Sequence, residues 1–156
     1  MASAEEQLKI LLEQLQNDVN ESLVEEVGEF IKDKEQEHII TDVYDMYSPK
    51  AYLRRGADDG LMADDNIIIS PIENGVRIEN IASVNPYYED KLDMYQEGTL
   101  ADIVEEGTAY DLFNKKSASY LDARPFRQNV VDELEATEEH VNVLSKSLKR
   151  KGYKIK

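Results

Sequence analysis

The first hydrophobic pattern along the chain has the period of an amphipathic helix. Apolar residues recur every three or four positions, and Ser3 followed by Glu6 has the form of a capping box. The apolar positions are Leu8, Leu12, Leu15, Val19, Leu23, Val27 and Phe30. The pattern predicts a helix that runs to about Lys34, which is roughly 45 Å long at 1.5 Å per residue. Either part of this rod packs on a neighbouring subunit, or it spans its own domain with a solvated acidic face.

The next two segments have weaker patterns. Residues 35–55 either extend the helix after a bend or form an extended segment, and Ser48-Pro49 is expected to end either structure. Residues 58–65 then carry four aspartates, but their spacing does not fit a calcium-binding loop. A solvated turn is the favoured interpretation.

The clearest strand pattern runs from Ile67 to Ala82. The dipeptide Asn74-Gly75 predicts a hairpin with a two-residue type I′ turn. One face of this hairpin is expected to meet the helices, and it carries Ile67, Ile69, Pro71, Val76, Ile78 and Ala82. The other face carries Ile68, Ile72 and Ile81. Pro71 lacks a backbone donor, which is typical of an edge strand, and such an edge is a natural place for another subunit to add.

Two helices are predicted in the C-terminal third. Thr99 caps a short helix over residues 100–106, which Gly107 closes. A longer amphipathic helix begins near Pro125 and ends before Gly152, and its apolar stripe is interrupted at Thr137 or Glu138. The chain is therefore expected to be one α+β domain over residues 1–156, with long N- and C-terminal helices packed on a small antiparallel sheet and joined by long loops.

Charge narrows the classes of function. The chain has 18 basic and 33 acidic residues, for a net charge of −15, which argues against specific nucleic-acid binding. A basic tail over residues 145–156 is the exception, with Lys146, Lys149, Arg150, Lys151, Lys154 and Lys156 and no acid. Helix-end charge complementarity or contact with an acidic neighbour explains such a tail. There is no cysteine, secretory signal or membrane-length apolar run, so we expect an untargeted intracellular protein without membrane contact.

No catalytic chemistry is indicated by the sequence. The two histidines, His38 and His140, lie about a hundred residues apart, and the common nucleotide-binding, hydrolase and metalloprotease motifs are absent. We therefore expect neither an enzyme nor a cofactor or metal site.

Tyrosine is over-represented, with nine residues against three Phe and no Trp. Most lie in segments predicted to be irregular, and tyrosine suits surfaces that are apolar at one end and wet at the other. The candidate interface residues, with two neighbouring arginines, are Tyr44, Tyr47, Tyr52, Arg54, Arg55, Tyr87, Tyr88 and Tyr95. The alternative is that the rings merely cover a small core.

Two short strings carry a resemblance to a known family. Val104-Glu105-Glu106-Gly107-Thr108 precedes Ala123-Arg124-Pro125-Phe126 and a closing helix, and this order resembles the head-tail joining, or tail-completion, proteins of tailed bacteriophages. The family's Pro-Val-Asp-Thr-Gly string is missing after the first helix, where this chain has residues 47–55 instead. The matching structural residues are Glu105, Gly107, Thr108, Arg124, Pro125 and Phe126.

The resemblance implies a non-enzymatic virion protein. Such a protein would assemble in the host cytoplasm into a ring, expected to be hexameric, that joins the head connector to the tail in the virion neck. It would bind other copies of itself and the neighbouring connector and tail proteins, and it would meet DNA only as the passing genome. The basic tail would then lie against an acidic neighbour, away from the channel. The competing hypothesis is a free acidic adaptor or DNA mimic that binds a host protein.

Overall fold

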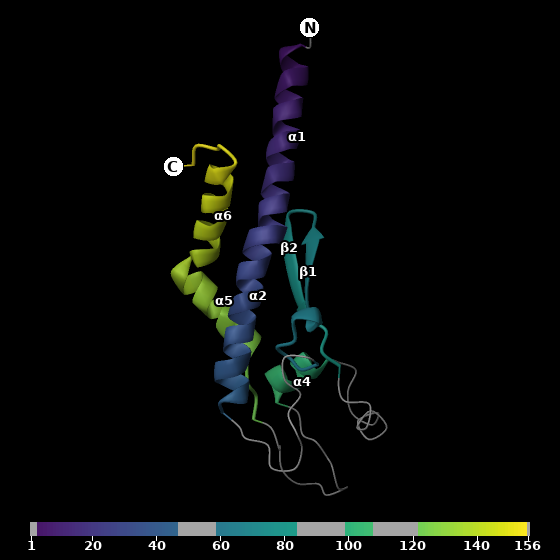
Figure 1. Cartoon of the computed structure of the whole chain (residues 1–156), viewed down its shortest axis with the longest axis vertical. Coiled ribbons are helices and arrows are strands. Elements are labelled where there is room, and N and C mark those ends of the chain that lie inside the picture. The colour runs from purple at the N-terminus through teal and green to yellow at the C-terminus, as the bar shows by residue number, and fades with distance from the viewer. Residues whose placement is uncertain (1–2, 47–58, 84–98, 108–121, 156) are drawn as a thin grey trace, which may run out of the picture.

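The computed structural model describes residues 3–46, 59–83, 99–107 and 122–155 of the chain (Figure 1). A long helical rod forms the spine of the molecule, and a two-stranded antiparallel hairpin and three shorter helices pack along it. The predicted α+β class is therefore confirmed. The N-terminal part of α1 extends beyond the hairpin and beyond α6 (Figure 1).

The rod is one continuous helix made of four consecutive segments. These are α1 (Ala4–Ser22), the π-helical turn η1 (Leu23–Gly28), α2 (Glu29–His38) and a second π-helical turn, η2 (Ile39–Tyr44). The predicted capping box is confirmed, because Ser3 Oγ accepts from the Glu6 amide and Glu6 Oε2 accepts from the Ser3 amide. The predicted end near Lys34 is wrong, and of the two alternatives left open for residues 35–55, extension of the helix is confirmed as far as Tyr44. The rod continues for ten further residues to Tyr44 because its last turns bury Ile39 and Val43 in the core.

The hairpin consists of β1 (Ile67–Ile72) and β2 (Gly75–Asn80), preceded by the short 3-10 helix η3 (Asp64–Asn66). The predicted type I′ turn at Asn74-Gly75 is wrong. Ile72 pairs with Gly75, so Glu73 and Asn74 form the turn, and neither has the positive φ that type I′ requires. The register differs from the predicted one by two positions, an even shift that leaves every side chain on its predicted face.

The hairpin face predicted to meet the helices does contact the rod, at Gly28. A Cβ on Gly28 would lie 2.6 Å from the Ile69 Cγ2 methyl and 3.4 Å from Val76 Cγ2, so only glycine lets the strands approach this closely. The opposite face remains open, with Ile72 and Ile81 about half exposed.

Three buried polar side chains, Lys32, Glu35 and Asn80, also hold the rod to the base of the hairpin. Lys32 Nζ lies 2.8 Å from Asp64 Oδ1. Asn80 donates its side-chain amide to Glu35 Oε1 at 3.0 Å and to the Leu61 carbonyl at 2.8 Å. Burial raises the pKa of Glu35, and the bond from Asn80 opposes this. Glu35 and Asn80 are desolvated but hydrogen-bonded to each other, and a core tolerates buried polar groups under this condition.

The described residues of the C-terminal third form three helices, where the sequence predicted two. α4 (Leu100–Glu106) has the predicted Thr99 cap and ends at Gly107, whose φ is 63°. The single predicted helix after Pro125 is wrong, because α5 (Phe126–Thr137) and α6 (Glu139–Arg150) are separated by Glu138 at φ 53°. The break falls where the apolar stripe is interrupted. It redirects α6 so that it packs beside η1 and the end of α1 (Figure 1).

The core lies where the lower half of the rod, the base of the hairpin, α4 and the first turn of α5 meet. Phe126 is fully buried in it. The other members of the cluster are Ile39, Val43, Leu61, Ile67, Ala82, Ala101 and Val104. These residues come from the end of the rod, the segments that flank the hairpin, β1, α4 and α5, so this one cluster joins those elements.

Truncation of Phe126 tests the central role of this ring. We expect Phe126→Ala to lower the free energy of unfolding by about 3–5 kcal/mol, since the ring is lost and a cavity remains. Val131→Ala, in the same helix at a side chain 45% exposed, is the matched control and is expected to cost under about 1 kcal/mol. Denaturant melting curves measure both. Overlapping curves for Phe126→Ala and the parent would contradict the assignment.

Candidate functional site

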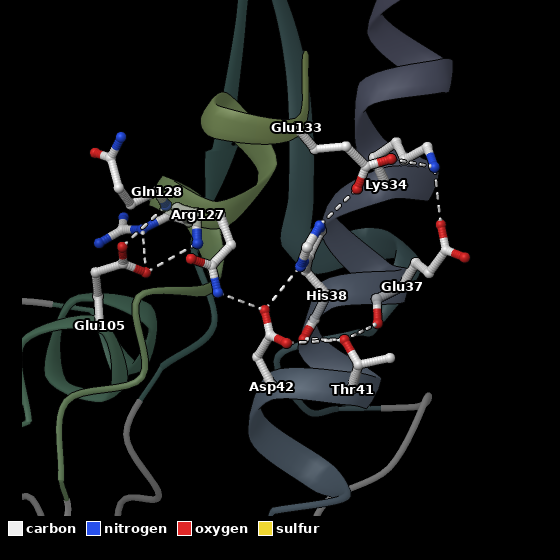
Figure 2. A network of polar contacts seen from close by, with 10 residues as sticks. Lys34, Glu37, His38, Thr41, Asp42, Glu105, Arg127, Gln128 and Glu133 are labelled. Carbon is white, nitrogen blue, oxygen red and sulfur yellow. Dashed lines mark hydrogen bonds and ion pairs between the residues drawn. The ribbon is translucent and has the colours of Figure 1, made fainter. Parts of the chain in front are cut away.

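The two sequence strings that carry the family resemblance meet in space. Glu105 in α4 accepts the amide of Arg127 at 3.0 Å and the amide of Gln128 at 3.1 Å, one on each carboxylate oxygen (Figure 2). These amides belong to the first turn of α5, where backbone donors have no partner within the helix. A carboxylate at this position both caps the helix and complements its dipole.

Further contacts close the junction between the strings. The Arg124 amide donates to the Val104 carbonyl at 3.0 Å, and the Arg127 guanidinium lies 2.9 Å from Asp102 and 5.8 Å from the centre of the Phe126 ring. A Cβ on Gly107 would lie 2.2 Å from the Ala123 amide nitrogen, so glycine is required by both its φ and its space.

The structure therefore unites five of the six motif residues. Pro125 precedes α5 as its cap residue, and Phe126 anchors the helix. Thr108 lies outside the described residues. The junction is structural in character, because each polar group in it satisfies another group of the same chain.

A second polar network joins the rod to α5 through His38. Its Nδ1 lies 2.7 Å from Asp42 Oδ2 and its Nε2 lies 2.9 Å from Glu133 Oε2 (Figure 2). Lys34 Nζ also reaches Glu133 at 2.7 Å, and Asn129 donates to Asp42 at 2.8 Å. With a carboxylate at each ring nitrogen, the imidazole links two helices.

Charge stabilises the protonated form of this histidine. Burial lowers the pKa of His38, but the hydrogen bonds to Asp42 and Glu133 outweigh it, so the pKa is raised. The bonds from Lys34 and His38 lower the pKa of Glu133. At Asp42 burial raises the pKa, but the hydrogen bonds from Asn129 and His38 outweigh this effect, so the pKa is lowered. Glu133 thus bridges Lys34 and His38, and Asp42 holds the other nitrogen of the His38 ring.

Sequence reasoning treated His38 as an isolated surface residue and missed this network. The detectable signal was the spacing of Lys34, His38 and Asp42, which lie four residues apart on one helical face. It was concealed because the helix was predicted to stop at Lys34.

One of the candidate interface residues lies in the described part of the chain. Tyr44 is half-buried at the lower end of the rod and packs against the core cluster, where the sequence predicted an irregular segment. The others, Tyr47, Tyr52, Arg54, Arg55, Tyr87, Tyr88 and Tyr95, fall outside the described residues. Their role as interface residues stays a prediction.

The upper half of α1 carries the first part of the predicted apolar stripe, and this part is exposed. Leu8, Leu11, Leu12 and Leu15, called here the leucine face, are 58%, 61%, 57% and 37% exposed. At 100° per residue these four lie within one arc of about 100° on the helix. Scattered exposed leucines need no explanation, but four on one stripe of a projecting helix are typical of an interaction surface.

The basic tail contacts acids of its own chain. Arg150 pairs with Glu26, and Lys151 Nζ lies 3.0 Å from Glu21 and 3.6 Å from Asp18. The Tyr153 hydroxyl donates to Asp18 at 2.5 Å. Half of the tail belongs to α6, and these contacts hold that helix against the rod.

Two other kinds of site do not occur among the described residues. They contain no group of three or more His, Asp or Glu side chains arranged to hold a metal ion. Within the same residues, no helix is both long and apolar enough to cross a membrane.

Comparison with known proteins identifies the family. The sequence model of the YomN family matches residues 7–150. The chain belongs to the YomN family. A relative from Bacillus subtilis (strain 168), described as "SPbeta prophage-derived uncharacterized protein YomN", is 31% identical over 99 residues. The aligned region covers 64% of this chain and 60% of that relative, so the chain spans less than two thirds of its length. No solved structure matches.

The YomN match supports the bacteriophage association that the sequence predicted, through a prophage-derived member of the family. It does not distinguish a head-tail joining protein from other bacteriophage proteins. That finer assignment stays a prediction.

Removal of the Glu105 carboxylate tests the junction. We expect Glu105→Ala to lower the free energy of unfolding by about 0.5–2 kcal/mol, because two amides of α5 lose their cap. Glu106→Ala is the matched control, since the neighbouring side chain is exposed and caps no helix among the described residues. Equal denaturation midpoints for the two variants would show that Glu105 does not cap α5.

The raised pKa of His38 predicts a pH dependence of stability. The stabilisation is fully present below the unfolded pKa of about 6.5 and is lost as pH rises through the higher folded pKa. We therefore expect the stability difference between the parent and His38→Gln to be larger at about pH 6 than at about pH 9. Urea denaturation measures the difference, and NMR titration of the ring measures the pKa. A ring pKa at or below about 6.5 would refute the network's effect.

Proposed function

We propose that this chain is a non-enzymatic structural protein of a tailed bacteriophage, which assembles into a ring in the neck of the particle and joins head to tail. The observation that carries the proposal is the leucine face on the projecting half of α1. A side-chain surface of this kind suits a protein whose task is to hold other proteins. Membership of a family with a prophage-derived member supports the bacteriophage setting.

The internal organisation suits an assembly component. The Glu105 junction and the His38 network satisfy their polar groups within the chain and fix the lower half of the rod. A rigid base with a projecting contact arm can repeat around a ring if the arm of one copy meets a different surface of the next.

The net charge of −15 is also compatible with a ring around the path of genome exit. An acidic wall repels the phosphate backbone, so DNA slides past without binding. The cations nearest the rod are paired with acids of the same chain, which reduces their attraction for DNA.

The test is to locate the protein in a phage that encodes it. We expect purified particles to contain it in several copies, and we expect deletion of its gene to yield filled heads and separate tails under the electron microscope. Complementation with the parent gene is the control and should restore joined particles. Absence from particles, with recovery of the protein bound to a host nucleic-acid-binding protein, would instead favour the acidic DNA mimic.

A further inference from the structure

We propose that copies of this chain associate head to tail, with the leucine face of one copy seated in the basic groove of the next. The basic groove is a shallow cavity of about 490 Å³ lined by Glu26, Val143, Lys146, Lys149 and Arg150. The proposal deepens the proposed function and rests on it for the ring in which the contact would occur.

The first step of the argument is that the leucine face continues a stripe that the chain already uses. α6 covers the lower part of this stripe, where the Ser147 hydroxyl lies 2.8 Å from Ser22 Oγ and 2.7 Å from Glu26 Oε1. The chain then leaves the rod near Asp18, where Tyr153 makes its last described contact with the rod. At 100° per residue, the leucine face lies on the same side of the helix as Ser22, about two to four turns further up. A packing surface thus continues past the end of the element that packs on it (Figure 1).

The second step is that the groove offers matching chemistry. Val143 and the aliphatic stems of the lysines supply apolar surface, and their ammonium groups remain at the rim. Lys146 and Lys149 are exposed, and neither forms an ion pair with another described residue. Leucines can therefore be buried in the groove while the lysines stay free to meet acids at its edge.

The third step is charge complementarity, which selects a second copy as the occupant. The projecting part of α1, residues 4–17, carries Glu5, Glu6 and Glu13 against the single cation Lys9. Glu5 borders the leucine face, and Glu6 and Glu13 lie on the far side of the helix. Pairing two leucine faces would place two acidic helices side by side, whereas the groove opposes one acidic helix with lysines. The same net negative charge disfavours an anionic membrane.

The fourth step is that the leucine face of one copy cannot reach the basic groove of the same copy. The leucine face and the groove lie at different heights along one continuous helix, so a single chain cannot fold one onto the other. Contact between different patches on different copies is heterologous, and it produces either a closed ring or an open filament.

A mixing experiment on the full chain tests the proposal. Leu11→Glu/Leu15→Glu disables the leucine face, and Lys146→Glu/Lys149→Glu disables the groove. Light scattering with size exclusion should show concentration-dependent oligomers for the parent and monomers for each variant alone. An equimolar mixture should form dimers only, because the intact face of one variant meets the intact groove of the other. Ile10→Glu, on the opposite side of α1, is the matched control and should associate like the parent.

The outcomes separate the competing occupants. Each variant should bind its complement within about threefold of the parent's dissociation constant and bind itself at least about tenfold more weakly, since a buried unpaired charge costs over 1.4 kcal/mol. Far-UV circular dichroism and melting curves confirm that each variant is folded. A groove variant that still self-associates would overturn the proposal in favour of pairing between leucine faces.

A parent that stays monomeric at about millimolar concentration, where contacts weaker than about 4 kcal/mol are lost, would overturn it in favour of a different partner. The proposed function is judged separately. A monomer found in particles refutes only the head-to-tail contact, and a head-to-tail oligomer absent from particles refutes only the proposed function.

Discussion

The burial of Phe126 against the lower half of the rod is the constraint on which the remaining structure depends. The ring fixes the start of α5 beside α4, and Ile39 and Val43 hold the rod on its other side. The Glu105 cap, the tight passage at Gly107 and the His38 network all require this placement, because each spans two elements that the ring brings together. The polar contacts specify the arrangement, while apolar burial supplies most of its stability.

The features predicted correctly from the sequence depend on residues close together in the chain. The Ser3–Glu6 capping box, the Thr99 cap, the Gly107 terminator and the inward face of the hairpin follow from local spacing or from a period of two. The wrong predictions concern non-local effects. Burial of Ile39 extends the rod past Lys34, and packing of α6 on the rod selects a left-handed residue at Glu138 that carries no glycine signal.

The candidate site was less predictable than the fold. The strings around Glu105 and Phe126 carry a resemblance that is visible in the sequence. The capping of α5 by Glu105 is not visible there, because it depends on the approach of the two strings in space. The leucine face shows the converse limit. A helical period reveals which residues share a stripe, and it does not reveal where the covering element ends.

The uneven support of the rod has a mechanical consequence. Its lower half packs against the hairpin, α5 and α6, while the part before Asp18 is a cantilever, a beam held at one end only. A load on the tip of a cantilever produces its greatest bending moment where the support begins, which here is the end of α1 and the π-helical turn η1. The methyl contacts at Gly28 sit in that turn, so a pull on the arm would be felt first at the hairpin and only afterwards in the core.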